Sequence, residues 1–224
     1  TTDTIDHRFG YWVKFLPETV ISISGAGINI DTIPVRPRWN LIGSVNIPLP
    51  VSQVVQDPPG NSMTEFFGYD DGYFIADTIL PGKAYWVKNM TAGTYILDAT
   101  APSIPAKAHL GVTAGDILSG LNKITLSAGE DQHRSPSATR GLFFGTDPAG
   151  IISAERFELP PVPPAGVFDV RFSSQSSVSL VPNHTDHDLE IPLLIQTSGT
   201  SVDLSWVMNA EDIRHYEIVG AVGS

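Results

Sequence analysis

Cysteine is absent from this chain of 224 residues, so no disulfide framework holds its fold and no thiol is available for catalysis. Charged residues are scarce, at 17% of the sequence. No apolar run approaches the roughly 20 residues of a membrane-spanning helix, so we expect no membrane insertion. The opening residues, Thr1–His7, do not resemble a secretory signal, and we expect a mature chain or one cut from something longer.

Basic residues are also few. The chain has 13 Lys and Arg against 24 Asp and Glu, which gives a net charge of −11 and a pI of about 4.8. Nucleic acids and anionic membrane surfaces need a basic footprint, so neither is an expected partner. The acidic balance suits solubility in an exposed setting.

Glycine and proline are plentiful instead, at 20 and 18 residues, which favours many short strands and turns over long helices. The sequence therefore predicts an all-β fold with two small domains. The boundary is expected at the small and proline-rich segment Ala99–Ala106. Residues 1–100 form a β-rich, repeat-containing module, and residues 107–224 form an immunoglobulin- or fibronectin-like sandwich with Trp206 as its core anchor.

Residues Phe66–Asn89 are the most informative stretch of the first module. They predict strands at 73–76 and 84–88, separated by a turn at Pro81-Gly82. The end of this stretch is echoed at Gly10–Lys14, where Trp12 corresponds to Trp86. Each copy is followed by a second β-prone run, at 19–23 and 94–97, so we interpret the repeat as a strand pair.

The first copy of the repeat is incomplete, because nothing equivalent to residues 66–83 precedes it. An orphan strand pair can complete the sheet of a neighbouring molecule, and head-to-tail pairing that does not close gives a filament. The expected strand-exchange contacts are the apolar residues of both strands: Tyr11, Trp12, Val13, Phe15, Val20, Ile21 and Ile23.

Aromatic residues provide an alternative, a carbohydrate-binding module that contacts a polysaccharide. Its stacking faces would come from Trp12, Trp39, Tyr73 and Trp86. The competing interpretation is that these rings pack in the core.

Candidate ligands for a metal are confined to two short segments. His184–Asp188 alternates imidazole and carboxylate groups, and Asp70–Gly72 offers hard oxygens for Ca²⁺. Solvated turns explain both segments better than metal sites do, and we expect no metal and no cofactor. No nucleophile elbow, phosphate-binding loop or dinucleotide fingerprint occurs, so we expect no enzymatic activity, with an accessory domain of a secreted hydrolase as a further alternative.

Several strings together resemble a known group of proteins. They are RWNLIGS (38–44), FFGYDDGYFIADTILPGKAYWVK (66–88), LFFG (142–145), FELPPVPPAGVFDVRF (157–172) and VDLSW (202–206). They are similar to the carboxyl-terminal region of large secreted proteins of the Bacteroidetes–Chlorobi–Ignavibacteria group, which carry type IX secretion sorting domains. The segment 129–140 departs from the resemblance by its length. The resemblance implies a non-catalytic module at the cell surface or outside the cell.

Three Asp-Thr-Ile tripeptides look like the O-glycosylation sequon of Bacteroidetes and make Thr4, Thr32 and Thr78 candidate glycan sites. Chance and the β propensity of Thr-Ile are the competing explanation. The sequence thus predicts a non-catalytic extracellular structural or adhesion module. Its expected partners are further copies of itself, other domains of a parent surface protein, or a polysaccharide.

Overall fold

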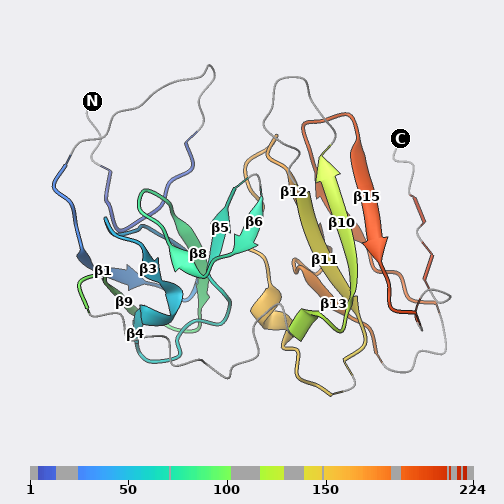
Figure 1. The fold of residues 1–224 in the computed structure, drawn as a ribbon, viewed down its shortest axis with the longest axis horizontal. Coiled ribbons are helices and arrows are strands. Elements are labelled where there is room, and N and C mark those ends of the chain that lie inside the picture. The colour runs from blue at the N-terminus through green and yellow to red at the C-terminus, as the bar shows by residue number, and fades with distance from the viewer. Residues whose placement is uncertain are drawn as a thin grey trace. The chain divides into compact units, whose positions relative to one another are not determined.

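The computed structural model describes residues 5–13, 25–70, 72–101, 117–128, 139–147, 149–182, 188–210, 212, 216–217 and 219–220. These residues contain fifteen strands and two short 3-10 helices, and the protein is all-β, as the sequence predicts. The chain divides into two compact units (Figure 1). Unit 1 comprises Thr1–Gly111 and Glu155–Pro164, and unit 2 comprises Val112–Ala154 and Ala165–Ser224. Residues 155–164, which the sequence analysis grouped with the second domain, thus belong to unit 1.

The described residues of unit 1 form three antiparallel sheets. Their orders are β1-β9-β4, β2-β8-β5-β6 and β3-β7. The strands are β1 (Ile30–Val35), β2 (Arg38–Ile42), β3 (Leu49–Pro50), β4 (Val55–Asp57), β5 (Phe67–Tyr69), β6 (Tyr73–Ile75), β7 (Thr78–Ile79), β8 (Tyr85–Asn89) and β9 (Gly93–Asp98), with a 3-10 helix η1 at Val51–Gln53. The predicted turn at Pro81-Gly82 is present, and Gly82 adopts a φ of 72°, which favours glycine.

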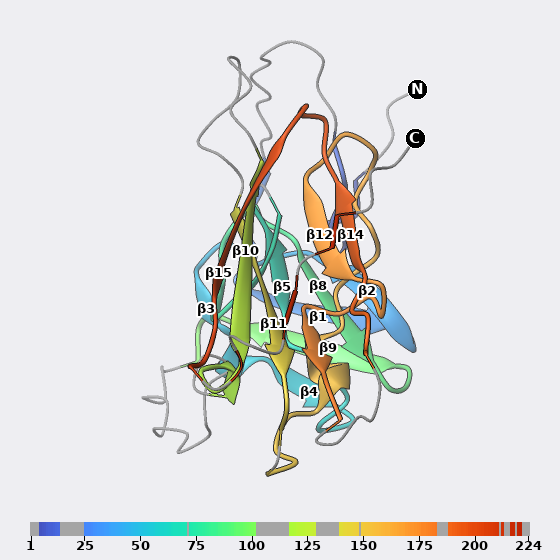
Figure 2. The same cartoon turned by 90° about the vertical axis from the view of Figure 1, so that its right-hand side faces the viewer.

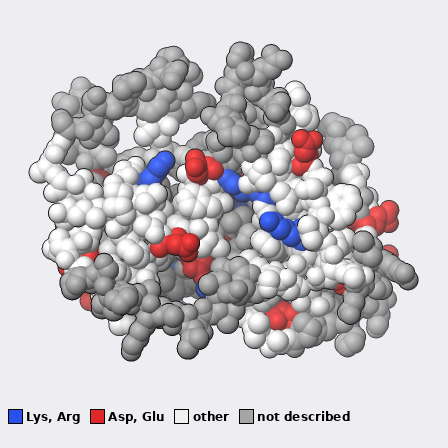
Figure 3. All heavy atoms as spheres, viewed as in Figure 1, with Lys and Arg blue, Asp and Glu red and all other residues white. Residues whose placement is uncertain are grey.

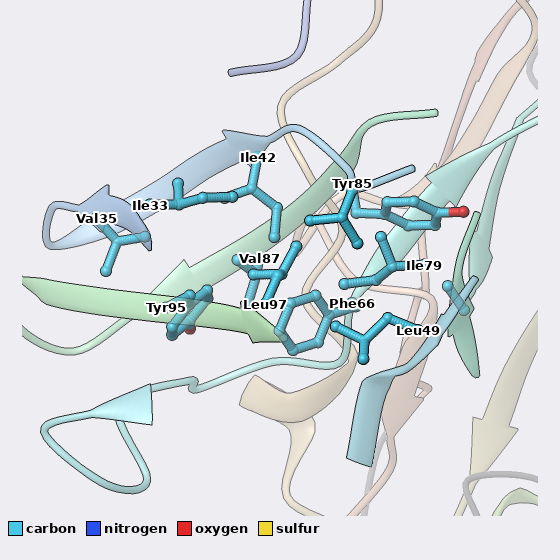
Figure 4. Packing of buried hydrophobic residues seen from close by; sticks show 12 residues of the cluster. Ile33, Val35, Ile42, Leu49, Phe66, Ile79, Tyr85, Val87, Tyr95 and Leu97 are labelled. Atoms are coloured by element: carbon cyan, nitrogen blue, oxygen red, sulfur yellow. The ribbon is translucent and has the colours of Figure 1, made fainter. Parts of the chain in front are cut away.

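The core of unit 1 follows from strand alternation. Tyr85 and Val87 of β8 point inward, whereas Trp86 and Lys88 point to the opposite face. Figure 4 shows the inward residues of β8 packed with Tyr95 and Leu97 of β9 and with aliphatic residues of β1 and β2. Burying each such side chain contributes about 1.5–3 kcal/mol, so this cluster is the main source of the unit's stability.

The predicted pairing of 84–88 with 94–97 is wrong, because β8 and β9 belong to different sheets. β8 pairs with β2 and β5, whereas β9 pairs with β1 and β4. Both strands carry inward aromatic and aliphatic residues, and packing these faces against each other buries more apolar surface than pairing the edges does.

The described part of the first repeat copy also differs from the prediction. Residues 11–13 form no strand, and residues 14–24 lie outside the described residues. The preceding residues extend the sheet beyond β2 instead: Gly10 N–H donates to the Leu41 carbonyl at 3.0 Å, and Gly43 N–H donates to the Arg8 carbonyl at 2.9 Å. A Cβ at Gly43 would overlap the carbonyl oxygen of His7, so the close approach requires glycine.

Unit 2 contains a four-stranded sheet of order β13-β11-β10-β15 and a two-stranded sheet, β12-β14 (Figure 2). Its strands are β10 (Asn122–Ala128), β11 (Thr139–Gly145), β12 (Asp169–Phe172), β13 (Val178–Leu180), β14 (Leu193–Gln196) and β15 (Val202–Val207). A second 3-10 helix, η2 (Ala154–Phe157), spans the passage from unit 2 back to unit 1. The β11–β13 pair is parallel and the other pairs are antiparallel. Both sheets contribute to one buried cluster that includes Leu126, Leu142, Val170 and Phe172, which gives a sandwich-like arrangement.

Trp206 is not the core anchor of unit 2, which corrects the sequence prediction. It lies at the end of β15, pairs with Ile124 of β10, and is 54% exposed. Phenylalanines fill the core instead: Phe144, Phe168 and Phe172 are buried, and the Tyr216 ring meets Phe144 edge-on at 4.9 Å. Trp206 remains exposed despite its size because β15 is an outer strand of its sheet.

A buried ion pair lies on β12, where all four residues are buried. Arg171 donates to both carboxylate oxygens of Asp169, from Nε at 2.6 Å and from the terminal guanidinium nitrogen at 2.9 Å. Arg171 also donates to Gln175 at 3.2 Å. The two-residue spacing places both charges on one face of the strand, opposite the face of Val170 and Phe172.

Candidate functional site

The outer face of the sheet β2-β8-β5-β6 carries a group of aromatic residues from all four strands. Cross-strand pairs place Phe67 opposite Trp86 and Tyr69 opposite Tyr73, and alternation turns all of them away from the main core. Trp39 of β2 completes the group, which we call the outer aromatic cluster: Trp39, Phe67, Tyr69, Tyr73 and Trp86. This group includes three of the four predicted stacking residues.

The rings of this cluster meet edge to face. Trp39 and Trp86 are 6.4 Å apart with an 87° angle between their planes, and Tyr69 and Tyr73 are 5.4 Å apart at 85°. Such contacts are typical of packed aromatic pairs, whereas a sugar platform needs open, coplanar rings. Tyr73 is buried, and Trp39 and Trp86 are half-buried.

A segment from much later in the sequence completes the cluster. Leu159 is buried against Phe67 and Tyr73, and the Tyr73 hydroxyl donates to the Pro161 carbonyl at 2.8 Å. The carbonyl oxygen of Pro161 lies outside the strands and is therefore free to accept this hydrogen bond from a side chain. We call residues 155–164 the returning segment.

Two residues of the returning segment form ion pairs with earlier residues of unit 1. Lys88 of β8 pairs with Glu158, and Arg156 pairs with Glu65. All four side chains are partly exposed, so each pair contributes only modestly to stability. The two pairs help to fix the register of the segment, because Arg156 and Glu158 carry opposite charges and each faces a different partner of unit 1.

Trp12 is the predicted stacking residue with the most open surface. It is 41% exposed and meets Tyr69 edge-on at 4.9 Å. The predicted strand-exchange residues Tyr11 and Val13 are also exposed. The remaining ones, Phe15, Val20, Ile21 and Ile23, lie outside the described residues.

The candidate glycan sites differ in access. Thr32 is exposed on β1, an outer strand of its sheet, and its N–H is held by the Asp31 side chain at 2.8 Å. Thr78 is half-buried where β7 pairs with β3. Thr4 lies outside the described residues.

The candidate metal ligands are largely outside the described residues, which exclude 183–187 and Asp71. Among the residues that are described, no group of three or more His, Cys, Asp or Glu is placed to hold a metal ion. A shallow hollow of about 180 Å³ lies beside Gly27, Asn46 and Pro81 in unit 1, and its lining carries no ionisable side chain. Such a lining provides no acid or base for catalysis.

Charged groups on the described surface are few and scattered among uncharged ones on the face in Figure 3. The clearest electrostatic effect is at Asp6, where the hydrogen bonds from the Arg8 side chain and backbone lower the pKa of the carboxyl from 3.8 to about 2. Burial raises the pKa of Tyr95, although its hydroxyl donates to Asn89 at 2.7 Å. In the part of the chain that the structure describes, no helix is long and apolar enough to cross a membrane.

Sequence analysis did not identify the returning segment as part of this site. The one available signal was the alternation of Phe157 and Leu159 with charged residues, directly before the prolines. No protein-family model, no curated protein and no solved structure matches the chain.

Proposed function

We propose that this chain is a non-catalytic structural or adhesion module of a bacterial protein that acts outside the cell or on its surface. The observation that carries this proposal is the returning segment. The chain passes from unit 1 to unit 2, returns for residues 155–164, and passes to unit 2 again. The chain therefore crosses between the units three times. A force that pulls the two units apart is shared among three connections and does not act on a single linker.

The contacts of the returning segment suit a load along the chain. Leu159 is buried, Tyr73 donates a hydrogen bond directly to Pro161, and Arg156 and Glu158 form ion pairs with Glu65 and Lys88. Extracting the segment breaks these contacts together and exposes the outer aromatic cluster to water. Cooperative loss of this kind resists force better than separate weak contacts.

Self-assembly into a filament is the finer form of the proposal. Its contacts are the exposed Tyr11, Trp12 and Val13 together with residues 15–23 of the sequence. Deleting residues 1–24 is expected to abolish filaments seen by negative-stain microscopy. Filaments that form normally without these residues would contradict this form and leave the broader proposal intact.

Carbohydrate binding is a second candidate, and the open face of Trp12 beside exposed Tyr11 favours it. Replacing Trp12 by Ala would then abolish binding on a polysaccharide array, whereas the half-buried Trp39 would affect binding only through folding. Equal binding by the Trp12→Ala variant and the native chain would exclude this site.

Two experiments test the broader proposal: antibody labelling of intact cells of the source organism, and mechanical unfolding of single molecules. Antibodies against the purified chain are expected to label unpermeabilised cells or secreted material. Pulling single molecules from both ends is expected to show one main unfolding event that includes unit 1 and the returning segment. Labelling that requires permeabilisation would overturn the location, and hydrolysis of a substrate by the pure chain would overturn the non-catalytic role.

A further inference from the structure

Strand β15 forms an open, apolar edge of unit 2. It pairs with β10 along its whole length, and the described residues provide no strand on its other side. Proteins usually protect such edges with lysine, proline or very short strands. β15 has six residues and Asp203 as its single charge, and it ends in Trp206 and Val207, which are 54% and 71% exposed.

The two faces of β15 have different chemistry. Val202, Leu204 and Trp206 lie on the core-facing side, because they pair with Ala128, Leu126 and Ile124 of β10. Val202 and Leu204 pack against the core, so Trp206 continues that apolar row into solvent. Asp203 and Ser205 lie on the outer side and are exposed.

The sequence of β15 is complementary to itself in the antiparallel register centred on Leu204, which pairs all three core-facing residues. Pairing centred on Leu204 places Leu204 opposite Leu204 of a second copy, Val202 opposite Trp206, and Asp203 opposite Ser205. Apolar groups then meet on the core-facing side, and Asp203 meets Ser205 on the outer side, where Val207 lies opposite Ser201. A register centred on Asp203 would oppose two carboxylates, and a shift by a single residue would set the apolar row of one copy against the polar row of the other.

We propose that β15 pairs with β15 of a second copy of this chain in this register, which joins two four-stranded sheets into one continuous sheet. The contact is isologous and related by a two-fold axis, so it closes as a dimer and does not propagate into a fibre. Main-chain hydrogen bonds along the free edge provide affinity, and the Val202–Trp206 pairs cover the exposed indole. The dimer rests on strand geometry and does not depend on the proposed function.

The mass of the full chain in solution tests the pairing. Sedimentation equilibrium over about 1–300 μM is expected to show conversion from the 24.1 kDa chain to twice that mass, since a pairing of this size suits micromolar affinity. A chain that remains monomeric throughout this range would overturn the proposal. Species that grow beyond two copies, and still do so when residues 1–24 are deleted, would overturn the closed register.

Variants of Ser205 test the register. Ser205→Asp places a carboxylate opposite Asp203 twice in each dimer and is expected to weaken association at least fivefold. Adding Asp203→Ser exchanges the two positions, restores a Ser–Asp pair with the native net charge, and is expected to restore the native Kd. Both positions are exposed, so folding is preserved, and circular dichroism checks this.

Ser153→Asp is the matched control, because it adds the same charge at an exposed position of unit 2 that is not part of β15. It is expected to leave the Kd unchanged. If Ser205→Asp dimerises as tightly as this control, or if the Asp203→Ser exchange fails to restore association, the proposed register is wrong.

Discussion

Arg8 acts on Asp6 at the scale of single residues. Its side chain donates to both carboxylate oxygens, and its N–H donates at 3.0 Å. Replacing Arg8 by Met removes the side-chain bonds, so we expect the pKa of Asp6 to rise from about 2 toward 3.8. A carbon-detected NMR titration of the Asp6 carboxyl measures this value, and Arg36→Met is the control that should leave it unchanged.

The sign of the accompanying pH dependence follows from the lowered pKa. An ionised Asp6 stabilises the turn at residues 6–9 above about pH 4, and this contribution fades as the pH falls through about 2. The Arg8→Met variant should lack most of that dependence. An Asp6 pKa near 2 in both proteins would contradict the assignment to the Arg8 side chain.

The buried pair on β12 gives a second prediction at this scale. Arg171→Met leaves the Asp169 carboxylate buried without its main partner, so we expect it to lower the free energy of unfolding by about 3–5 kcal/mol. Adding Asp169→Leu removes the stranded charge and should recover much of the loss. Urea unfolding measures both, and a double variant less stable than the single one would contradict this explanation.

The position of this strand can be predicted from the sequence, but the burial of its charged residues cannot. The alternation in Val167–Phe172 is typical of a strand and sets Asp169 and Arg171 on the face away from Val170 and Phe172 of β12. Alternation alone assigns such a face to solvent. Both charges can be buried because Arg171 donates to both carboxylate oxygens of Asp169. This geometry depends on side-chain positions, which the periodicity of the sequence does not specify.

At the scale of elements, Gly43 fixes how the residues before Tyr11 lie against β2. Gly43→Ala would place a methyl group onto the His7 carbonyl, so we expect residues 5–13 to detach while the sheets of unit 1 persist. Hydrogen exchange at Gly10 and Gly43, whose N–H groups bridge the two segments, should accelerate at least tenfold.

Gly25→Ala is the control for this variant, since a Cβ at Gly25 meets no other atom. It should leave the exchange rates of residues 5–13 unchanged. Unaltered exchange in Gly43→Ala would show that the segment is held by other contacts.

Element positions were more predictable than their pairing. β-prone residues and turn signals predict strands at 73–76, 84–88 and 94–97, and β6, β8 and β9 lie within about one residue of these ranges. Which strands pair depends on contacts between distant parts of the chain, so the local layout of β8 and β9 led to the wrong pairing. Trp206 was misplaced for the same reason, because its exposure reflects the end of β15 at a sheet edge.

At the scale of the whole molecule, the returning segment makes unit 1 depend on later sequence. Leu159→Ala removes a buried side chain from the outer aromatic cluster, and we expect it to destabilise unit 1 by about 2–5 kcal/mol. Trp39 and Trp86 lie in the same cluster, so their fluorescence reports the transition. Val162→Ala, at an exposed position of the same segment, is the control and should cost less than about 0.5 kcal/mol.

Unit 1 includes a segment that is synthesised late, so its folding cannot be completed until residues 155–164 have been made. Leu159 is synthesised about 60 residues after β9 ends, which takes about 3–12 s at about 5–20 residues/s. During that interval the strands of the outer sheet exist without the leucine that covers their aromatic rings. The nascent chain therefore exposes these aromatic rings to solvent until Val112–Ala154, the first part of unit 2, has also been made.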